Sequence, residues 1–424
     1  MMGDQPVIII GAGPYGLSIA AHLAKAGIKT RVFGKCMETW ATGMPAGMFL
    51  KSAAAATDIS DPDRQFTIEA FCALRGIPYD PLEMLLPVDL FTAYGLAFQQ
   101  KFVPHLETQM VTRVAGVRGG YEVTFDDGTV IRAAHVIVAT GIRRFGKVPE
   151  ALAGLPAGLL SHSSEVSDLS HLRGRDVIVL GGGSSAADVA AALHRFGAKP
   201  TLVARRGILR FPPTGKRRRW YDEIRAPMTP LGPGWNKVLA WKGALVFHKM
   251  PARFRTAVVR RYLGPSPTLS VKETIESHVR LMLKAQVTSA DVVDERVELR
   301  IQQDGVESVM HADHVIAATG YNIVLDRLGF LDEELVRSIA CTTGYPKLSS
   351  TFQSSREGLY FVGTPSAVSF GPVMRFVCGT QFCAQRLTKH FRRVVRRQQR
   401  RAASLPEPQG NWANSTEVPA DPAT

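Results

Sequence analysis

Apolar runs that lead into glycine-rich turns occur at two places in this 424-residue chain, and each opens an alternating pattern of strands and helices. In the first, the β-branched run at 6–10 predicts a buried strand, 17–26 have helical spacing, and 30–33 predict a second strand. The pattern restarts near Gly174. Its expected elements are a strand at 177–181, a helix at 184–196 and a strand at 200–203. Two such units predict an α/β protein with two doubly wound domains.

Each unit also closes with the same apolar strand and Ala-Thr-Gly turn. The sequence AAHVIVATGIR at 133–143 is repeated as ADHVIAATGYN at 312–322. In residues 121–141, apolar and polar residues alternate on both sides of an Asp-Gly turn, which predicts a hairpin, and the segment then ends in the apolar strand. Near the C-terminus, 358–366 predict another buried strand, which a helix to about residue 392 follows.

Two segments lack the nucleotide-binding pattern. Residues 207–285 are rich in Pro, Gly, Trp and Arg, and we expect a mostly helical insertion, since so long a structureless loop is improbable in a compact domain. We expect this aromatic and basic insertion to determine the substrate. Residues 402–424 have the composition of a disordered tail.

The first turn, GAGPYG at 11–16, fits the G-x-G-x-x-G pattern directly between a strand and a helix. Gly11 permits the tight turn, Gly13 lets the backbone approach a pyrophosphate, and Gly16 lets the helix pack on the strand. The anion would lie beside Pro14 at the N-terminus of the helix, where unpaired N–H groups favour negative charge. This turn therefore predicts a dinucleotide site.

The second turn, GGGSSA at 181–186, has alanine at its third glycine position. Neither unit has an acid at the end of its second strand, where one commonly holds a ribose. Gly34 and Lys35 occupy that place in the first unit, and Arg205 and Arg206 occupy it in the second. Guanidinium groups suit a 2′-phosphate, which favours NADPH over NADH; a solvated basic edge is the alternative. The expected NADPH residues of the turn are Gly181, Gly183, Ser184 and Ser185.

The order of the units resembles that of the flavoproteins with two dinucleotide-binding domains. The chain begins with one dinucleotide unit, inserts a second, and then returns to the first. The resemblance implies Rossmann-like domains, with FAD in the first and NADPH, which reduces the flavin, in the second. The FAD domain is expected at 1–155 and 321–392. The NADPH domain is expected at 156–320 and would carry the insertion at about 207–285.

Disulfide reductases of that architecture need a cysteine pair beside the flavin, and the five cysteines here include no C-x-x-C pair. Gly363-Thr364 also replaces their usual Gly-Asp. The chain is more similar to the class B flavoprotein monooxygenases, which comprise flavin-containing monooxygenases, Baeyer–Villiger enzymes and lysine/ornithine N-hydroxylases. The motifs that carry this resemblance are GAGPYGLS, the Phe-Leu-Lys at 49–51, and DHVIAATGY at 313–321.

The resemblance implies roles for several further residues. Lys51 would lie near the flavin and hydrogen-bond its N5 or a peroxide, with a surface lysine as the alternative. Trp40 would pack near the flavin or the substrate mouth, or else in the core, and His162 would shape the linker between domains. The other residues expected at FAD are Lys35, Gly141 and Gly363, and those expected at NADPH are Thr319 and Gly320. The histidines have no metal-ligand spacing, so we expect no metal.

Composition limits the classes of function. The net charge of +14 suggests affinity for anionic cofactors, but no signature of nucleic-acid recognition accompanies it. No apolar run approaches the ~20 residues of a membrane span, and no secretion signal precedes the first strand. Unpaired cysteines are typical of a reducing compartment, so we expect a cytoplasmic protein. Because the sequence has no signature of nucleic-acid recognition, we expect it not to bind nucleic acid.

The leading hypothesis is an FAD- and NADPH-dependent monooxygenase that oxygenates a small organic substrate with O2 through a C4a-(hydro)peroxyflavin. One alternative is an NAD(P)H:acceptor flavin oxidoreductase that passes electrons on without oxygenation. A purine (urate) hydroxylase is a second alternative. The third alternative is not an enzyme: it is a redox-sensing protein that retains both dinucleotide-binding folds.

Overall fold

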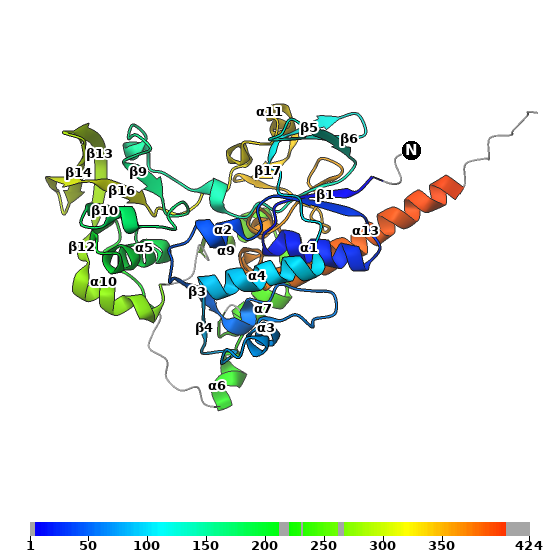
Figure 1. Ribbon diagram of the computed structural model, residues 1–424, viewed down its shortest axis with the longest axis horizontal. Coiled ribbons are helices and arrows are strands. Elements are labelled where there is room, and N and C mark those ends of the chain that lie inside the picture. The colour runs from blue at the N-terminus through cyan, green and yellow to red at the C-terminus, as the bar shows by residue number, and fades with distance from the viewer. Residues whose placement is uncertain (1–4, 212–219, 230–231, 262–266, 404–424) are drawn as a thin grey trace, which may run out of the picture.

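Two parallel sheets, each with a helix after its first glycine turn, form the frame of the protein (Figure 1). The computed structural model describes residues 5–211, 220–229, 232–261 and 267–403. The predicted α/β class with two units of parallel strands is confirmed.

The first parallel sheet is built around the first apolar run. Its strands, in spatial order, are β19 (Leu359–Phe361), β8 (Val136–Val138), β1 (Val7–Ile10) and β2 (Thr30–Phe33). Helix α1 (Pro14–Lys25) connects β1 to β2. Leu359 of β19 pairs with Val136 of β8, so the chain returns to this sheet after the whole second unit.

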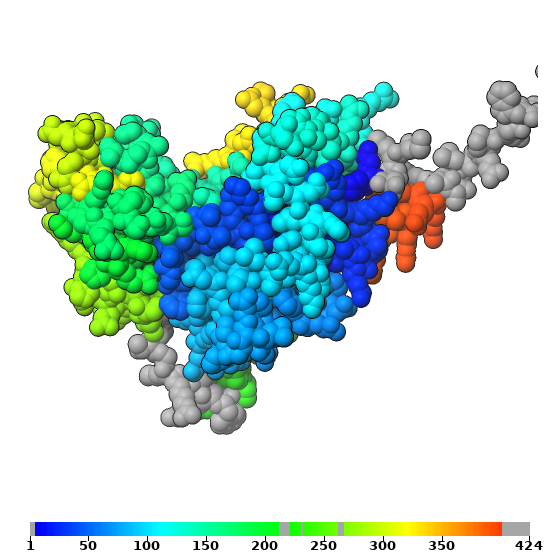
Figure 2. Space-filling model, in the orientation of Figure 1, coloured from blue at the N-terminus to red at the C-terminus, as the bar shows by residue number. Residues whose placement is uncertain are grey.

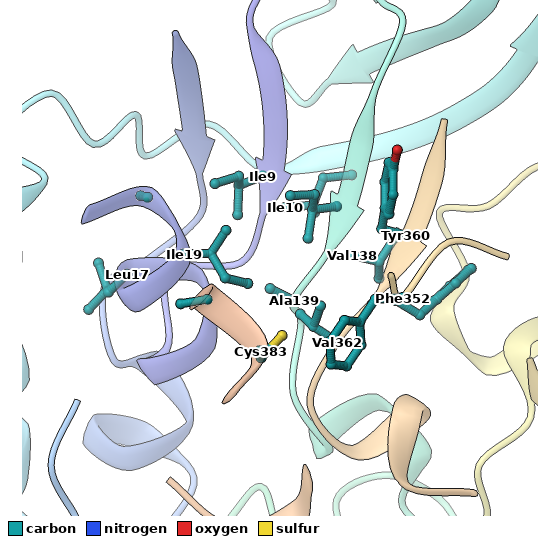
Figure 3. Packing of buried hydrophobic residues seen from close by; sticks show 14 of the residues in the cluster. Ile9, Ile10, Leu17, Ile19, Val138, Ala139, Phe352, Tyr360, Val362 and Cys383 are labelled. Atoms are coloured by element: carbon teal, nitrogen blue, oxygen red, sulfur yellow. The ribbon is translucent and has the colours of Figure 1, made fainter. Parts of the chain in front are cut away.

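The core of the first unit fills the space between this sheet and its helices. Figure 3 shows Ile19 of α1 facing Ile9 and Ile10 of β1, with Val138 of β8 on the far side of β1 and all four residues in one buried cluster. Cys383, from the C-terminal helix α13 (Gly379–Ala403), belongs to the same buried cluster. Segments from both ends of the chain therefore stabilise the first glycine turn.

The second parallel sheet has a different layer on each face. Its strands, in spatial order, are β12 (Arg280–Leu283), β11 (Lys199–Ala204), β10 (Asp176–Leu180), β16 (His314–Ala317) and β9 (Leu160–His162). Side chains alternate between the faces of a strand, so Val177 and Val179 pack with helix α5 (Ser184–Arg195). Ile178 and Leu180 belong to the cluster on the opposite face.

Two three-stranded antiparallel sheets accompany the parallel ones. The first follows the predicted hairpin and consists of β5 (Val111–Val117), β6 (Gly120–Phe125) and β7 (Val130–Ala133). The second covers the other face of the second parallel sheet and consists of β13 (Ala285–Val293), β14 (Arg296–Gln303) and β15 (Val306–Ala312). Leu299 and Ile301 of β14 are buried in that contact.

The predicted insertion is helical over most of its described length. Its helices are α6 (Trp220–Arg225), α7 (Trp235–Lys242), α8 (Ala244–Lys249), α9 (Ala252–Arg261) and α10 (Lys272–His278). Residues 280–283 differ from the prediction, because they form β12 at the edge of the second sheet. The strand has four residues and a single buried side chain, so no apolar alternation marks it in the sequence.

The C-terminal helix is also longer than predicted. α13 continues past residue 392 to Ala403, and its second half projects from the body of the protein (Figure 1). Arg and Gln, which favour helices, occupy most of this extension, although few apolar residues mark it. Of the predicted tail at 402–424, residues 404–424 lie outside the described part of the chain.

Short elements complete the fold. The helices are α2 (Glu38–Thr42), α3 (Ile68–Leu74), α4 (Val88–Phe102), α11 (Glu333–Ser338) and α12 (Ala367–Phe370). The strands are β3 (Phe49–Ala53), β4 (Leu85–Pro87), β17 (Cys341–Thr342) and β18 (Tyr345–Pro346). The 3₁₀ turns used below are η3 (Glu150–Leu152) and η8 (Pro372–Arg375).

Candidate active site

The first glycine turn is held by close backbone contacts between β1, α1 and β8. Gly11 has a φ of +113°, and a Cβ there would lie 2.5 Å from the carbonyl oxygen of Ala139. A Cβ on Gly16 would lie 1.8 Å from the carbonyl oxygen of Gly11. Only glycine avoids these clashes, which is the packing role predicted for the first and third glycines.

Gly13 is different, because a Cβ there has no described atom within 4 Å and its φ is an ordinary −86°. This position precedes α1, whose first N–H groups donate to no side chain in the described part of the protein. The first N–H groups of the helix therefore remain available to an anion in the open space beside Gly13. A pyrophosphate fits this cradle.

The second turn repeats the arrangement. Gly181 has a φ of +149°, and its Cβ would lie 2.2 Å from the carbonyl oxygen of Ala318. Gly183 again has no described atom within 4 Å of a Cβ, and no described side chain caps α5. The repeated Ala-Thr-Gly segments explain the symmetry, since Ala139 and Ala318 each donate a 2.8 Å backbone hydrogen bond to the end of the central strand.

Both turns open into one cavity of about 1320 Å³. The two units also touch beside it, where Arg195 of α5 donates a 3.2 Å hydrogen bond to the carbonyl oxygen of Gly47. Figure 2 shows the blue surface of the N-terminal segment adjoining the green surface of the second unit. Of the predicted site residues, Gly16 is not in the cavity wall. Those in the wall are Gly11, Gly13, Pro14, Lys35, Trp40, Lys51, Gly141, Gly181, Gly183, Ser184, Ser185, Arg205, Arg206, Thr319, Gly320 and Gly363.

Lys51 lies in the cavity wall as part of a buried ion pair. Its Nζ donates a hydrogen bond of 2.6 Å to Oδ1 of Asp188, and the two side chains are 8% and 4% exposed. Ser184 donates a second hydrogen bond of 3.1 Å to this carboxylate. Burial raises the pKa of Asp188, whereas Lys51 and Ser184 oppose that shift. The pair thus joins β3 of the first unit to the start of α5 in the second.

The two arginines after β11 are exposed side chains of the cavity wall. The side chain of Arg206 lies beside Gly182 of the second turn, 3.7 Å from a Cβ built there. Neither Arg205 nor Arg206 forms an ion pair with any residue that the structure describes. Both are therefore able to bind a phosphate near the second turn.

At the first turn, the structure adds an acid that the sequence analysis missed. Glu38 begins α2 in the cavity wall, with Oε1 4.0 Å from Nζ of Lys35 and 3.9 Å from Nη1 of Arg143. It is four residues beyond Gly34, where the usual ribose-binding acid is missing. Little in the sequence indicated Glu38, because the dinucleotide-binding pattern places the ribose-binding acid at the end of the second strand itself.

Trp40 is part of the cavity wall and His162 lies outside it, and both side chains contact neighbouring residues of the fold. The Trp40 ring is half-buried and packs edge-on against Phe91, with ring centroids 4.8 Å apart. His162 is buried at the end of β9, with Nδ1 2.8 Å from Oγ of Ser164 and Nε2 3.1 Å from the carbonyl oxygen of Gly320. Burial lowers the pKa of His162. The ring therefore links the strand to the second Ala-Thr-Gly turn.

Cys72 and Cys383 are buried, Cys36 and Cys378 are partly buried, and Cys341 is exposed. All five are free, and none belongs to the described cavity wall. Burial raises the pKa of Cys36 to about 11 and that of Cys378 to about 12. A redox-active thiol needs a lowered pKa, so this arrangement does not suit disulfide exchange.

Among the described residues, no three His, Cys, Asp or Glu side chains are grouped so that they could bind a metal ion. Nor does the described part of the chain contain a helix of the length and apolarity that a membrane span requires.

Parts of the sequence resemble known proteins. The sequence profile of the family described as pyridine nucleotide-disulphide oxidoreductase matches residues 5–224. The indole-3-pyruvate monooxygenase YUCCA1 of Oryza sativa subsp. japonica is 30% identical over 213 residues, covering 47% of this chain and 48% of the relative. A ferredoxin–NADP reductase of Granulibacter bethesdensis is 29% identical, covering 50% and 54%. The chain thus spans about half the length of these relatives.

The fold was compared with solved structures. The reduced form of the ornithine hydroxylase PvdA from Pseudomonas aeruginosa aligns with a TM-score of 0.69 at 16% sequence identity. The alignment covers 91% of this chain and 98% of that one, so the two share their whole fold. The predicted resemblance is confirmed in fold, and monooxygenases and hydroxylases are among the similar proteins.

Proposed function

The chain belongs to the pyridine nucleotide-disulphide oxidoreductase family, and from that premise we propose that it is an FAD- and NADPH-dependent monooxygenase of a small organic substrate. FAD would lie on the first turn and NADPH on the second. Residues 1–155 and 321–392 would form the FAD domain, and 156–320 the NADPH domain. The chemistry that the flavin supplies when bound is acceptance of a hydride from NADPH and activation of O2.

The observation that carries the proposal is the pair of open helix N-termini on one cavity. Gly13 and Gly183 leave room for the two pyrophosphates, and the first turns of α1 and α5 face them. Since both cradles open into the same cavity, the reactive ends of the two nucleotides can meet inside it. The chain's part is to bind both cofactors and hold them in register.

Residues between the turns would support the reaction by charge and by exclusion of water. The Lys51 ammonium, fixed by Asp188, places a buried positive charge in the wall between the two units. Met48, Leu50 and Met374 add apolar surface to the same cavity. Where the bound cofactors exclude water, the ammonium end of this ion pair would favour negative charge that develops during oxygen activation.

The cysteine positions favour oxygenation over disulfide reduction, because no described cysteine lines the cavity and burial raises the thiol pKa of Cys36 and Cys378. The similarity to a ferredoxin–NADP reductase supports an NAD(P)H:acceptor oxidoreductase as the second candidate. Unpaired cysteines also support a reducing compartment, and we place the enzyme in the cytoplasm.

Rapid mixing separates these candidates. We expect the purified yellow protein to be reduced by NADPH and, on mixing with O2, to form a transient absorbing species distinct from oxidised and reduced flavin. In ¹⁸O2, one labelled atom should appear in the product from a panel of amines, sulfides, purines and ketones. Reoxidation without a transient, together with rapid electron transfer to a quinone or an iron–sulfur protein, would establish the acceptor oxidoreductase instead.

Replacing both Arg205 and Arg206 by Gln should weaken NADPH binding and leave NADH binding nearly unchanged. Each lost charged hydrogen bond to a 2′-phosphate costs about 1.5–3 kcal/mol, or roughly 10-fold to 150-fold in affinity. The dissociation constants follow from the rate of flavin reduction at increasing NADPH or NADH. Arg210→Gln removes an exposed charge outside the cavity wall and serves as control. Equal losses for the two nucleotides would contradict the assigned role.

A further inference from the structure

Large apolar side chains are exposed on the helical insertion. Trp235 and Leu239 of α7 are 62% and 53% exposed, Val246 of α8 is 55% exposed, and Phe254 of α9 is 49% exposed. None of the four belongs to the described cavity wall. Exposed apolar side chains that gather on one side of a protein mark a surface that binds something else. The insertion therefore has an outer side that the cofactor cavity does not explain.

Cations share the exposed side of each of these helices. Trp235, Leu239 and Lys242 are spaced i, i+4 and i+7, so they lie along one side of α7. The exposed positions of α8 and α9 also fall on one side of each helix, where apolar residues stand next to Lys or Arg. We call these exposed positions the insertion face. Its members are Trp235, Leu239, Lys242, Leu245, Val246, Lys249, Arg253, Phe254, Arg260 and Arg261.

The opposite side of the insertion is packed against the first unit. Phe247 of α8 and Val259 of α9 belong to the buried core of that unit. One backbone group joins the two helices, because the carbonyl oxygen of Ser369 lies 3.2 Å from Nδ1 of His248 and accepts a 3.4 Å hydrogen bond from Nη1 of Arg255. Helix α7 packs against α8 and η8. The three helices therefore form one layer, and the insertion face is the side of that layer turned away from the core.

The charge of this layer decides what can cover it. No Asp or Glu occurs in the sequence between Glu223 and Glu273, whereas residues 232–261 alone contain seven Lys and Arg. A second copy of the insertion face would place cations against cations, so its charge opposes self-association. A complementary surface must carry negative charge and must also accept apolar side chains. The headgroup region of a bilayer with anionic phospholipid has both properties.

We propose that the insertion face binds the surface of a bilayer that contains anionic phospholipid. Its apolar side chains would enter the region between headgroups and acyl chains, where the indole of Trp235 is favoured, and its lysines and arginines would meet lipid phosphates. Helices that lie in the plane of this region need no membrane-spanning length. Helix α9 also contributes to the cavity wall, so the bilayer would be bound next to one side of the cavity. The proposal is independent of the reaction that the enzyme catalyses.

Cosedimentation of the full-length protein with lipid vesicles tests the proposal. We expect vesicles of phosphatidylcholine mixed with phosphatidylserine to bind the protein at least about 10-fold more tightly than vesicles of phosphatidylcholine alone. Trp235→Ser with Leu239→Ser should weaken binding to the mixed vesicles at least about 10-fold, because two apolar side chains no longer enter the bilayer. Lys242→Glu with Lys249→Glu should abolish the preference for phosphatidylserine. All four positions are exposed, so the variants should keep their circular dichroism spectra.

Matched controls make the same chemical changes on other surfaces. Val306→Ser with Val309→Ser removes two exposed apolar side chains of β15, and Arg392→Glu with Arg396→Glu reverses two exposed cations of α13. Both should bind the mixed vesicles as the unchanged protein does. Absence of vesicle binding overturns the proposal, as does binding that the serine substitutions in α7 leave intact or that the α13 variant loses. A dimer that those serine substitutions dissociate, in a protein that binds no vesicles, would overturn it in favour of self-association.

Discussion

A Gly13→Ala protein is expected to fold normally and to be purified without its yellow colour. The added Cβ meets no described protein atom within 4 Å, and the φ of −86° suits alanine. It would instead occupy the space in which the pyrophosphate approaches α1. Loss of two charged hydrogen bonds, at about 1.5 kcal/mol each, weakens FAD binding on the order of 10²-fold. The flavin-to-protein absorbance ratio after purification and the circular dichroism spectrum measure the two outcomes.

Matched glycines make this result specific. Gly158→Ala also meets no described atom within 4 Å, but it lies outside the cavity wall and should leave the protein yellow. Gly183→Ala should retain FAD and lose reduction by NADPH, because the second cradle alone is filled. Gly16→Ala should fail to fold, since its Cβ would lie 1.8 Å from the Gly11 carbonyl oxygen. A yellow Gly13→Ala protein with normal FAD content would refute the first site.

Asp188→Ala is expected to destabilise the protein by about 3–5 kcal/mol, because it leaves the buried ammonium of Lys51 without its partner. The double variant Lys51→Met with Asp188→Leu removes both charges and should regain most of that stability, since apolar side chains tolerate burial. Urea denaturation of Lys51→Met, Asp188→Leu and the double variant yields the coupling between the two positions.

An exposed ion pair supplies the control for this cycle. Arg113 and Asp332 are 2.5 Å apart, with side chains 56% and 26% exposed, and Arg113→Gln should cost less than about 1 kcal/mol. If Asp188→Ala costs no more than this, the pair does not hold the two units together. The double variant also separates stability from function: restored stability and normal flavin reduction by NADPH, without a transient species on mixing with O2, would assign the charge of Lys51 to oxygen activation.

The glycine turns show that the local sequence pattern predicts structure within one βαβ unit but not the contacts between distant segments. The sequence predicts strand, turn and helix at both sites because each role of a glycine depends on neighbours within one βαβ unit. It could not reveal that Ala139 and Ala318 form the opposite wall of the turns, because those contacts join residues more than 120 positions apart. The repeated Ala-Thr-Gly indicated a relationship between the units, and the structure supplied its physical basis.

The insertion and the C-terminal helix show where prediction from the sequence fails. Strand β12 has only one buried side chain, so its identity depends on pairing with β11, which the local pattern does not encode. Helix α13 extends beyond the predicted end because Arg and Gln favour helix without an apolar stripe. Phe247 and Val259 belong to the core of the first unit, although the insertion interrupts the second.

By itself, the sequence determined the α/β class and the two glycine turns, since backbone sterics and apolar periodicity act over a few positions, and the residues that it predicted for the cofactors mostly line the cavity. Only the tertiary structure decided that Lys51 pairs with Asp188, 137 positions away, and that Arg195 pairs with the carbonyl oxygen of Gly47. Such pairs depend on how distant elements pack, because the electrostatic energy of a charge is set by the groups around it in space rather than along the chain.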